Sequence, residues 1–334
     1  MAIDRKVTVM CNTVRDVDPY RGGQDVLRCI AADLWAQTMP ASDFEFIAVD
    51  GLYPYRADAL RLAFAASSFR VTHIGPRQTA MVQDHRVAIA AYKNSGVVRA
   101  RGELVVCVDD HCTLDPHYLE RAWAAWHRDG VMLAALSAFA DETGGVRIND
   151  SRVIYLDSNG RCVGPRGGDT AIPPQYGFCA VPLEAILAVN GWDEYFDGSQ
   201  GIEDADFGIR LQKAGYRVGL DRAHFVKLNG DSTPHDARLF PSGSSPIVKC
   251  CQSTARIQWG RGHVRANTYP WDSVEWAKMT PCYLARGRKC SLSGLDCAYP
   301  DTFAVREHEG LVALRNNPPV FDLREMRRAT GNAP

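Results

Sequence analysis

The sequence predicts an α/β fold in which a mostly parallel, twisted sheet is flanked by helices. Two observations lead to this prediction. Short apolar runs alternate with segments whose apolar residues recur at helical spacing, which is typical of βαβ units with right-handed crossovers. The run Leu104–Val108 shows no polar alternation, as expected of a strand that is covered on both faces in a parallel sheet.

The individual elements follow from these two patterns in chain order. The short apolar runs predict strands at Val7–Val14, Phe44–Val49, Phe69–Ile74, Leu104–Val108, Val131–Phe139 and Gly177–Val181, and a further short strand just before His224. The amphipathic segments predict helices at Asp25–Gln37, Ala57–Ala66, Met81–Ala100, His117–Arg128, Glu184–Val189 and Glu203–Ala214.

A stretch rich in Pro, Ser and Gly after Asp231 predicts a boundary within the chain. Residues 1–235 then form the main domain, and residues 236–334 form a C-terminal appendage that is rich in Cys, Trp and Arg. Because the appendage contains few apolar runs, we expect it to pack on the main domain rather than to build a core of its own.

Composition narrows the class of protein. The chain has 334 residues, a formal charge of -1 and a hydrophobic fraction of 46%, which are ordinary values for a globular protein without a global attraction to nucleic acid or membranes. No stretch approaches the ~20 apolar residues that a membrane-spanning helix needs, and the N-terminus lacks a secretory pattern. An odd number of mostly isolated cysteines favours a reducing compartment, so we expect a cytoplasmic protein.

A cluster of ionisable residues follows the strand Leu104–Val108. Asp109, Asp110 and His111 come directly after this apolar run, and burying such groups is costly unless they are paired or bound to something. In open α/β sheets, ligands collect outside the carboxyl ends of the strands. The cluster is therefore either a metal or ligand site or, since Asp is common in turns, a solvated turn.

The segment Ala90–Glu120 resembles the family-2-type glycosyltransferases of the GT-A fold. Those enzymes share an Arg/Lys-Asn-x-Gly helix core, a Gly-Glu turn and an apolar strand ending in a DxD motif, which correspond here to Lys93-Asn94-Ser95-Gly96, Gly102-Glu103 and Asp109-Asp110-His111. The third position resembles the D-x-H form of the polypeptide N-acetylgalactosaminyltransferases. The resemblance implies a nucleoside-diphosphate sugar as donor and Mn²⁺ (or Mg²⁺) held by Asp109 and His111.

A second segment, Asn190–Val218, resembles the acceptor side of the same family. It contains Gly191-Trp192-Asp193-Glu194 and then Glu203-Asp204 at the start of a helix. The resemblance implies that Asp204 is the general base, that Glu203 hydrogen-bonds the acceptor, and that Trp192 and Asp193 contribute to acceptor binding. Acidic residues at a helix start are also favoured by the helix dipole alone.

The remaining site residues are also carried over from the resemblance. His224 is the expected third metal ligand, with His235 as a reserve. Donor binding is expected from the strand-end residues and from the motif helix, namely Thr13, Asp50, Lys93, Asp109 and Asp110. Asp50 is expected to contact the base, although Gly51 follows where the family has a second Asp.

These residues predict a metal-dependent, inverting transfer from a UDP-sugar to an acceptor hydroxyl. The expected acceptors are glycans, lipids or protein hydroxyls. A rival acceptor is a hydroxyl-bearing modified base in nucleic acid, because Lys249–Lys289 is basic and interleaved with Trp259, Trp271 and Trp276. A nucleotidyltransferase or a non-catalytic binding module are further alternatives. A structural Zn²⁺ is a second metal hypothesis, at the appendage cysteines Cys250, Cys251, Cys282, Cys290 and Cys297.

Overall fold

The computed structural model describes residues 2–18, 21–77, 88–140, 146–149, 155–156, 162–163, 180–192, 203–216, 218–228 and Arg315. Within this part of the chain, no helix is long and apolar enough to cross a membrane.

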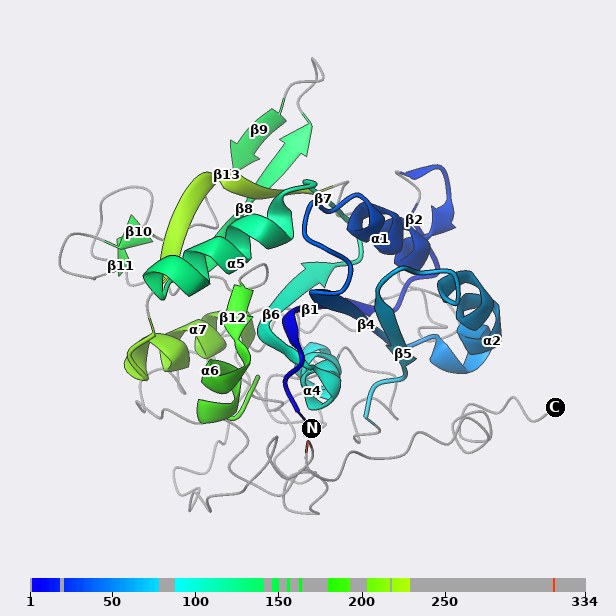
Figure 1. The fold of residues 1–334 in the computed structure, drawn as a ribbon, viewed down its shortest axis with the longest axis horizontal. Coiled ribbons are helices and arrows are strands. Elements are labelled where there is room, and N and C mark those ends of the chain that lie inside the picture. Colours follow the sequence, from blue (N-terminus) through cyan, green and yellow to red (C-terminus); the bar gives the residue numbers. More distant parts are fainter. Residues whose placement is uncertain are drawn as a thin grey trace, which may run out of the picture.

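A five-stranded sheet forms the centre of the fold (Figure 1). Its strand order is β12-β6-β1-β4-β5, with bounds Ala180–Pro182, Gly102–Asp109, Arg5–Thr13, Phe44–Asp50 and Arg70–Ile74. The pairs β6/β1, β1/β4 and β4/β5 are parallel, and the edge strand β12 is antiparallel to β6. The mostly parallel α/β sheet predicted from the alternating pattern is therefore confirmed.

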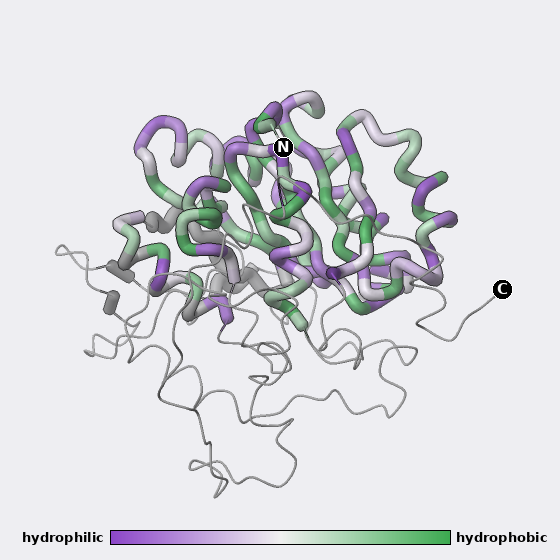
Figure 2. Tube along the Cα trace, turned by 90° about the horizontal axis from the view of Figure 1, so that it is seen from below, coloured by the Kyte–Doolittle hydropathy of each residue, from purple (hydrophilic) through white to green (hydrophobic). Residues whose placement is uncertain are grey.

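Helices cover both faces of this sheet (Figure 1). One face packs against α1 (Val26–Trp35), α2 (Tyr53–Phe64) and α5 (Tyr118–Asp129), and the other packs against α4 (Ile89–Arg99), α6 (Leu183–Ala188) and α7 (Glu203–Lys213). Hydrophobic stretches concentrate in the central strands, while hydrophilic stretches lie mainly on the outside (Figure 2). The two-sided cover explains why β6 contains a continuous apolar run.

A second sheet has the order β7-β13-β8-β9, with bounds Cys112–Leu114, Val218–Leu228, Met132–Ala140 and Val146–Asn149. Its β13/β8 pair is parallel, and the other two pairs are antiparallel. The very short strands β2 (Val17–Asp18) and β3 (Gln24–Asp25) pair with each other, as do β10 (Tyr155–Leu156) and β11 (Cys162–Val163).

Three of the predicted elements differ from the observed ones in their bounds or in the residues they contain. Helix α2 begins at Tyr53, four residues before the predicted start, because Pro54 occupies its first turn, where a missing N–H costs nothing. The described part of the helix predicted from Met81 begins at Ile89. His224 lies inside the eleven-residue strand β13 rather than after a short strand.

The predicted boundary between residues 235 and 236 lies outside the described residues. The described residue of the appendage, Arg315, is buried against the main domain. Its guanidinium donates from Nη1 to the carbonyl oxygens of Val97 and Ala100, each at 2.7 Å, at the C-terminal end of α4.

Candidate functional site

The carboxyl ends of three parallel strands lie side by side at one edge of the central sheet. Asn12 of β1 is in register with Asp109 of β6, and Thr13 is in register with Asp50 of β4. Strands that run in the same direction must present their carboxyl ends together, so the strand-end acids predicted as site residues gather at this edge.

Asp110 is fixed by three side chains on the α1 side of the strand ends. Its carboxylate accepts a 2.6 Å hydrogen bond from Thr13 Oγ1, forms an ion pair with Arg15 Nη1, and lies 3.3 Å from His111 Nδ1. Burial acts to raise the pKa of Asp110, but the His111 hydrogen bond and the Arg15 charge outweigh it and hold the pKa below its ordinary value.

Unlike Asp110, Asp109 has no side-chain partner among the described residues, and its pKa is raised. Its carboxylate accepts no hydrogen bond from the described residues, and the charges that act on its pKa are those of His111, Asp110, Lys93 and Asp204. Burial is the main cause that raises the pKa of this carboxyl group. A half-buried carboxylate that lacks a hydrogen-bonded partner is suited to binding a cation.

Lys93 links the two segments that carried the family resemblance. Its Nζ lies 3.3 Å from Glu203 Oε1 and contacts Asp204 Oδ1, and it sits 5.5 Å from the ring centroid of Trp192. Trp192 Nε1 in turn donates to Asp204 Oδ1 at 3.3 Å. Two motifs more than one hundred residues apart are thus joined into one charged cluster at the start of α7.

The two acids of this cluster, Glu203 and Asp204, differ in their environment. Burial, followed by the charge of Asp204, raises the pKa of Glu203 from its ordinary 4.5 to about 7. The pKa of Lys93 also rises, because the attraction of Asp204 and Glu203 outweighs the effect of burial. The side chain of Asp204 is 22% exposed and that of Glu203 is 6% exposed, so Asp204 is the more exposed of the two acids.

The other residues of the Lys93-Asn94-Ser95-Gly96 core each have a structural role that sequence reasoning missed. Asn94 Nδ2 donates to the Trp192 carbonyl at 2.8 Å, and the Trp192 N–H donates to Asn94 Oδ1 at 3.0 Å. Ser95 Oγ accepts from the Arg77 N–H at 2.8 Å. A Cβ on Gly96 would overlap Met10 Sδ, so glycine permits the close approach of α4 to β1.

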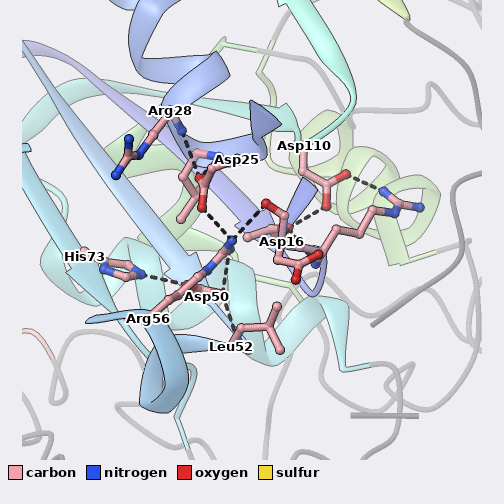
Figure 3. Close-up of polar contacts among 11 residues, drawn as sticks. Asp16, Asp25, Arg28, Asp50, Leu52, Arg56, His73 and Asp110 are labelled. Atoms are coloured by element: carbon pink, nitrogen blue, oxygen red, sulfur yellow. Dashed lines mark hydrogen bonds and ion pairs between the residues drawn. The ribbon is translucent and has the colours of Figure 1, made fainter. Parts of the chain in front are cut away.

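Asp50 is fully buried, and its carboxylate is occupied by the protein (Figure 3). Oδ1 accepts from the Leu52 N–H at 2.8 Å and from Arg56 Nη2 at 3.0 Å. Oδ2 is 2.6 Å from Arg56 Nε and 2.8 Å from His73 Nε2. No sequence signal pointed to Arg56 and His73 as partners. They direct this carboxylate inward, whereas the sequence predicted contact with a donor base.

His224 is fully buried in the interface between β13 and α5. Its ring stacks on Tyr118, with centroids 4.2 Å apart and an interplanar angle of 22°. Within the described ranges, no three His, Cys, Asp or Glu side chains lie close enough together to hold a metal ion. The structure therefore does not bring Asp109, His111 and His224 together as the sequence predicted, because β13 continues through His224 and aligns this side chain with the core.

Several sequence-predicted residues lie outside the described residues. They are Asp193, the reserve ligand His235, the basic stretch Lys249–Lys289 with its tryptophans, and the cysteines proposed for a structural Zn²⁺. Trp192, which is described, is buried and stacks on Phe207 of α7 with ring centroids 4.1 Å apart.

Two family models match overlapping parts of this chain. Residues 20–179 match the family model described as "Glycosyl transferase family 2", and residues 104–261 match the one described as "Glycosyl transferase family group 2". The comparison with curated proteins finds no match.

Two solved structures of glycosyltransferases share the fold. The first is residues 1–349 of TarS from S. aureus in complex with UDP-GlcNAc, with 13% identity, a TM-score of 0.50, and coverage of 69% of this chain and 60% of that chain. The second is the mannosyltransferase PcManGT from Pyrobaculum calidifontis in complex with GDP-Man and Mn²⁺, with 13% identity, a TM-score of 0.51, and coverage of 78% and 66%. The match spans less than two thirds of the length of either protein. The chain is thus similar to glycosyltransferase family 2 over residues 20–179 and 104–261, and it shares the GT-A fold of these two solved glycosyltransferases.

Proposed function

We propose that the protein is a metal-dependent, inverting glycosyltransferase that moves a sugar from a nucleoside-diphosphate sugar to an acceptor hydroxyl. The observation that carries this proposal is the contact of Lys93 with Glu203 and Asp204, since it joins the motif helix to the acidic pair expected to act on the acceptor. Asp109, the last residue of β6, is close enough for its charge to interact with both Lys93 and Asp204.

Asp204 is the proposed general base. In a single displacement, the acceptor oxygen forms a bond to the anomeric carbon while the bond from that carbon to the donor diphosphate breaks. The hydroxyl proton passes to Asp204 Oδ, and the bonding pair leaves with the diphosphate. Asp204 fits this role because it is the more exposed acid, while its oxygen Oδ1 is oriented by Lys93 and Trp192. Glu203 is the buried supporting acid.

The residues at the strand end fit a divalent cation with a small number of protein ligands. We assign Asp109 and His111 as these ligands, because Asp109 has a carboxylate without a hydrogen-bonded partner in the described part of the chain. Asp110 is already committed to Thr13 and Arg15. When bound, such a cation, completed by the donor phosphates, offsets the charge that develops on the leaving diphosphate.

The metal assignment predicts different effects for substitutions of His111 and of His224. We expect His111→Ala to abolish metal-dependent UDP binding in calorimetry, because it removes a ligand. His224→Phe should retain that binding, because a phenyl ring preserves the stacking on Tyr118. Loss of metal-dependent binding in a folded His224→Phe variant would restore His224 as the third ligand.

The donor is proposed to be a nucleotide sugar, with UDP-sugars tested first and GDP-sugars second. The support comes from the two similar structures, which contain UDP-GlcNAc and GDP-Man respectively. Thr13 remains on the proposed donor side, at the carboxyl end of β1. The contacts of Lys93 favour an acceptor-side role rather than donor binding, and the contacts of Asp50 favour a supporting role.

The acceptor stays a prediction, with glycan, lipid and protein hydroxyls ranked together before a modified base in nucleic acid. The nucleic-acid alternative requires binding that weakens steeply with salt. An absence of DNA and RNA binding in gel shifts at low salt would remove it.

The function is tested with a panel of nucleotide sugars. Donor hydrolysis and thermal stabilisation are measured with Mn²⁺ and with EDTA, and we expect at least one sugar nucleotide to be hydrolysed and to stabilise the protein only with the metal. Binding of no sugar nucleotide would contradict the proposal, and equal activity in EDTA would contradict the metal dependence. Product stereochemistry by NMR tests inversion once an acceptor is found.

A further inference from the structure

A guanidinium group lies at the donor side of the strand ends, and no sequence motif pointed to it. Arg15 follows β1 by two residues, and its backbone N–H donates to Thr13 Oγ1 at 3.0 Å. Its Nη1 forms the ion pair with Asp110 and lies 3.5 Å from His111 Nδ1. The side chain is therefore held beside the Asp109-Asp110-His111 segment.

The hydrogen-bonding capacity of Arg15 is only partly used within the described residues. Its Nε is buried and has no hydrogen-bond partner there. Arg56, the second arginine near this edge, provides an internal comparison: its Nε, Nη1 and Nη2 all donate to protein oxygens, among them those of Asp50 and Asp25. Arg56 is thus a structural cation, whereas Arg15 has a buried Nε–H that no described residue accepts from.

The negative charges at the end of β6 favour a positively charged side chain beside them. Asp109 and Asp110 both lie at the end of β6, and a diphosphate that approached them would meet two carboxylates. The Arg15 charge offsets that of Asp110, and a guanidinium presents its remaining N–H groups in a planar fork that matches phosphate oxygens.

From this arrangement we propose that Arg15 binds the diphosphate of the nucleotide-sugar donor directly and stabilises it as the leaving group. This role rests on the proposed function, and it deepens that function by assigning a protein cation to the diphosphate in addition to the divalent metal. Asp110 is the positioning residue that holds Arg15 in place.

The test compares ligands that differ only in their phosphates. Affinities for UDP and GDP, and for uridine and guanosine, are measured by calorimetry or NMR titration in Mn²⁺ and in EDTA. We expect Arg15→Gln to weaken binding of the preferred nucleoside diphosphate by about 10- to 100-fold, since a charge-assisted hydrogen bond contributes about 1.5–3 kcal/mol. Binding of the matching nucleoside should not change. Arg15→Lys should recover part of the loss, because lysine restores the charge but not the fork.

Two further variants separate a direct contact from other effects. Arg128→Gln removes an exposed positive charge that is paired with Asp129 on α5, and it should leave both affinities unchanged. Arg15→Gln combined with Asp110→Asn removes both members of the buried ion pair. If Arg15 only neutralised Asp110, the double variant would regain UDP affinity, whereas a direct contact predicts that the loss persists.

The outcomes distinguish this inference from the proposed function. A wild-type protein that binds no nucleoside diphosphate overturns both. The role of Arg15 alone is overturned if the wild-type protein binds a nucleoside diphosphate but Arg15→Gln does not weaken that binding selectively. This is the case if the variant loses affinity for the diphosphate and for the nucleoside equally, or keeps both affinities. If Arg15→Gln does not fold, the ratio of diphosphate to nucleoside affinity in Arg15→Lys decides in the same way.

Discussion

At the residue scale, the cluster of Lys93, Glu203 and Asp204 divides two tasks between two adjacent acids. A buried lysine is stabilised by carboxylates on two sides, and one of these carboxylates remains partly exposed. Lys93 thus orients Asp204 without covering it. Trp192 completes the arrangement, because its Nε1–H and its ring both contact members of the cluster.

Replacement of Asp204 by Asn tests its role as base. The amide keeps the size of the side chain but is far less basic, so we expect transfer to fall by orders of magnitude while UDP affinity is retained. Steady-state kinetics and calorimetry measure the two quantities. Near-normal turnover would move the base elsewhere, with Glu203 as the first candidate.

Replacement of Glu203 by Gln tests the raised pKa of this residue. Because the pKa of Glu203 is about 7 in the folded state and about 4.5 when exposed, the folded protein binds more protons than the unfolded chain between these pH values. This residue therefore lowers the free energy of unfolding as the pH rises from about 4.5 to about 7. Urea unfolding across this window should show a flatter pH dependence in Glu203→Gln, and an unchanged dependence would contradict the raised pKa.

At the element scale, α4 is the helix on which the site is built. It packs on the same face of the central sheet as α6 and α7, and each residue of its Lys93-Asn94-Ser95-Gly96 core contacts a different part of the fold. Asn94 joins α4 to the Trp192 turn by a pair of hydrogen bonds, so the position of the acceptor-side segment depends on the position of this helix.

A methyl group at Gly96 should disturb this packing. The added Cβ would overlap Met10, whose side chain is fully buried, so we expect Gly96→Ala to destabilise the fold by about 1–3 kcal/mol in urea unfolding. Met10→Ala provides the matched control, because it removes the overlapping atoms. The double variant should then be less destabilised than the sum of the two single variants, and strict additivity would show that the two residues are not in contact.

At the scale of the whole molecule, Arg315 connects the C-terminal part of the chain to the helix that carries Lys93. Its guanidinium binds two of the carbonyl groups that a helix leaves without partners at its C-terminal end. Arg315 is more than two hundred residues after α4 in the sequence, and it stabilises the C-terminal end of this helix. That end lies away from the carboxyl ends of β1, β4 and β6, where the candidate site is.

Arg315→Gln should therefore lower stability more than it lowers ligand affinity. Leaving buried carbonyl groups without a donor costs roughly 1–3 kcal/mol, so thermal unfolding should occur at a lower temperature while UDP affinity at 25 °C stays close to that of the wild type. The exposed control Arg128→Gln should leave the unfolding temperature unchanged. An unaffected unfolding temperature in Arg315→Gln would show that this contact does not contribute to the fold.

The sequence by itself determined the α/β class, the order of most elements and the location of the acidic strand end. These features follow from local periodicity, and local periodicity is a property of adjacent residues. The chain segment Leu104–Val108 predicted a strand covered on both faces, and β6 is such a strand. The resemblance of two segments to one family likewise depends on residues that lie close together along the chain.

Only the tertiary structure decided which groups are partners. Lys93 meets Glu203 and Asp204, Asp50 is bound by Arg56 and His73, and His224 is stacked in the core, although the sequence predicted ligand contacts for each of these residues. Local sequence patterns constrain backbone conformation, but the direction of a side chain and its partners depend on how distant elements pack. Because a buried charge is costly unless it is paired, and the paired residues here come from distant segments, the roles of these polar residues could not be predicted from their immediate neighbours.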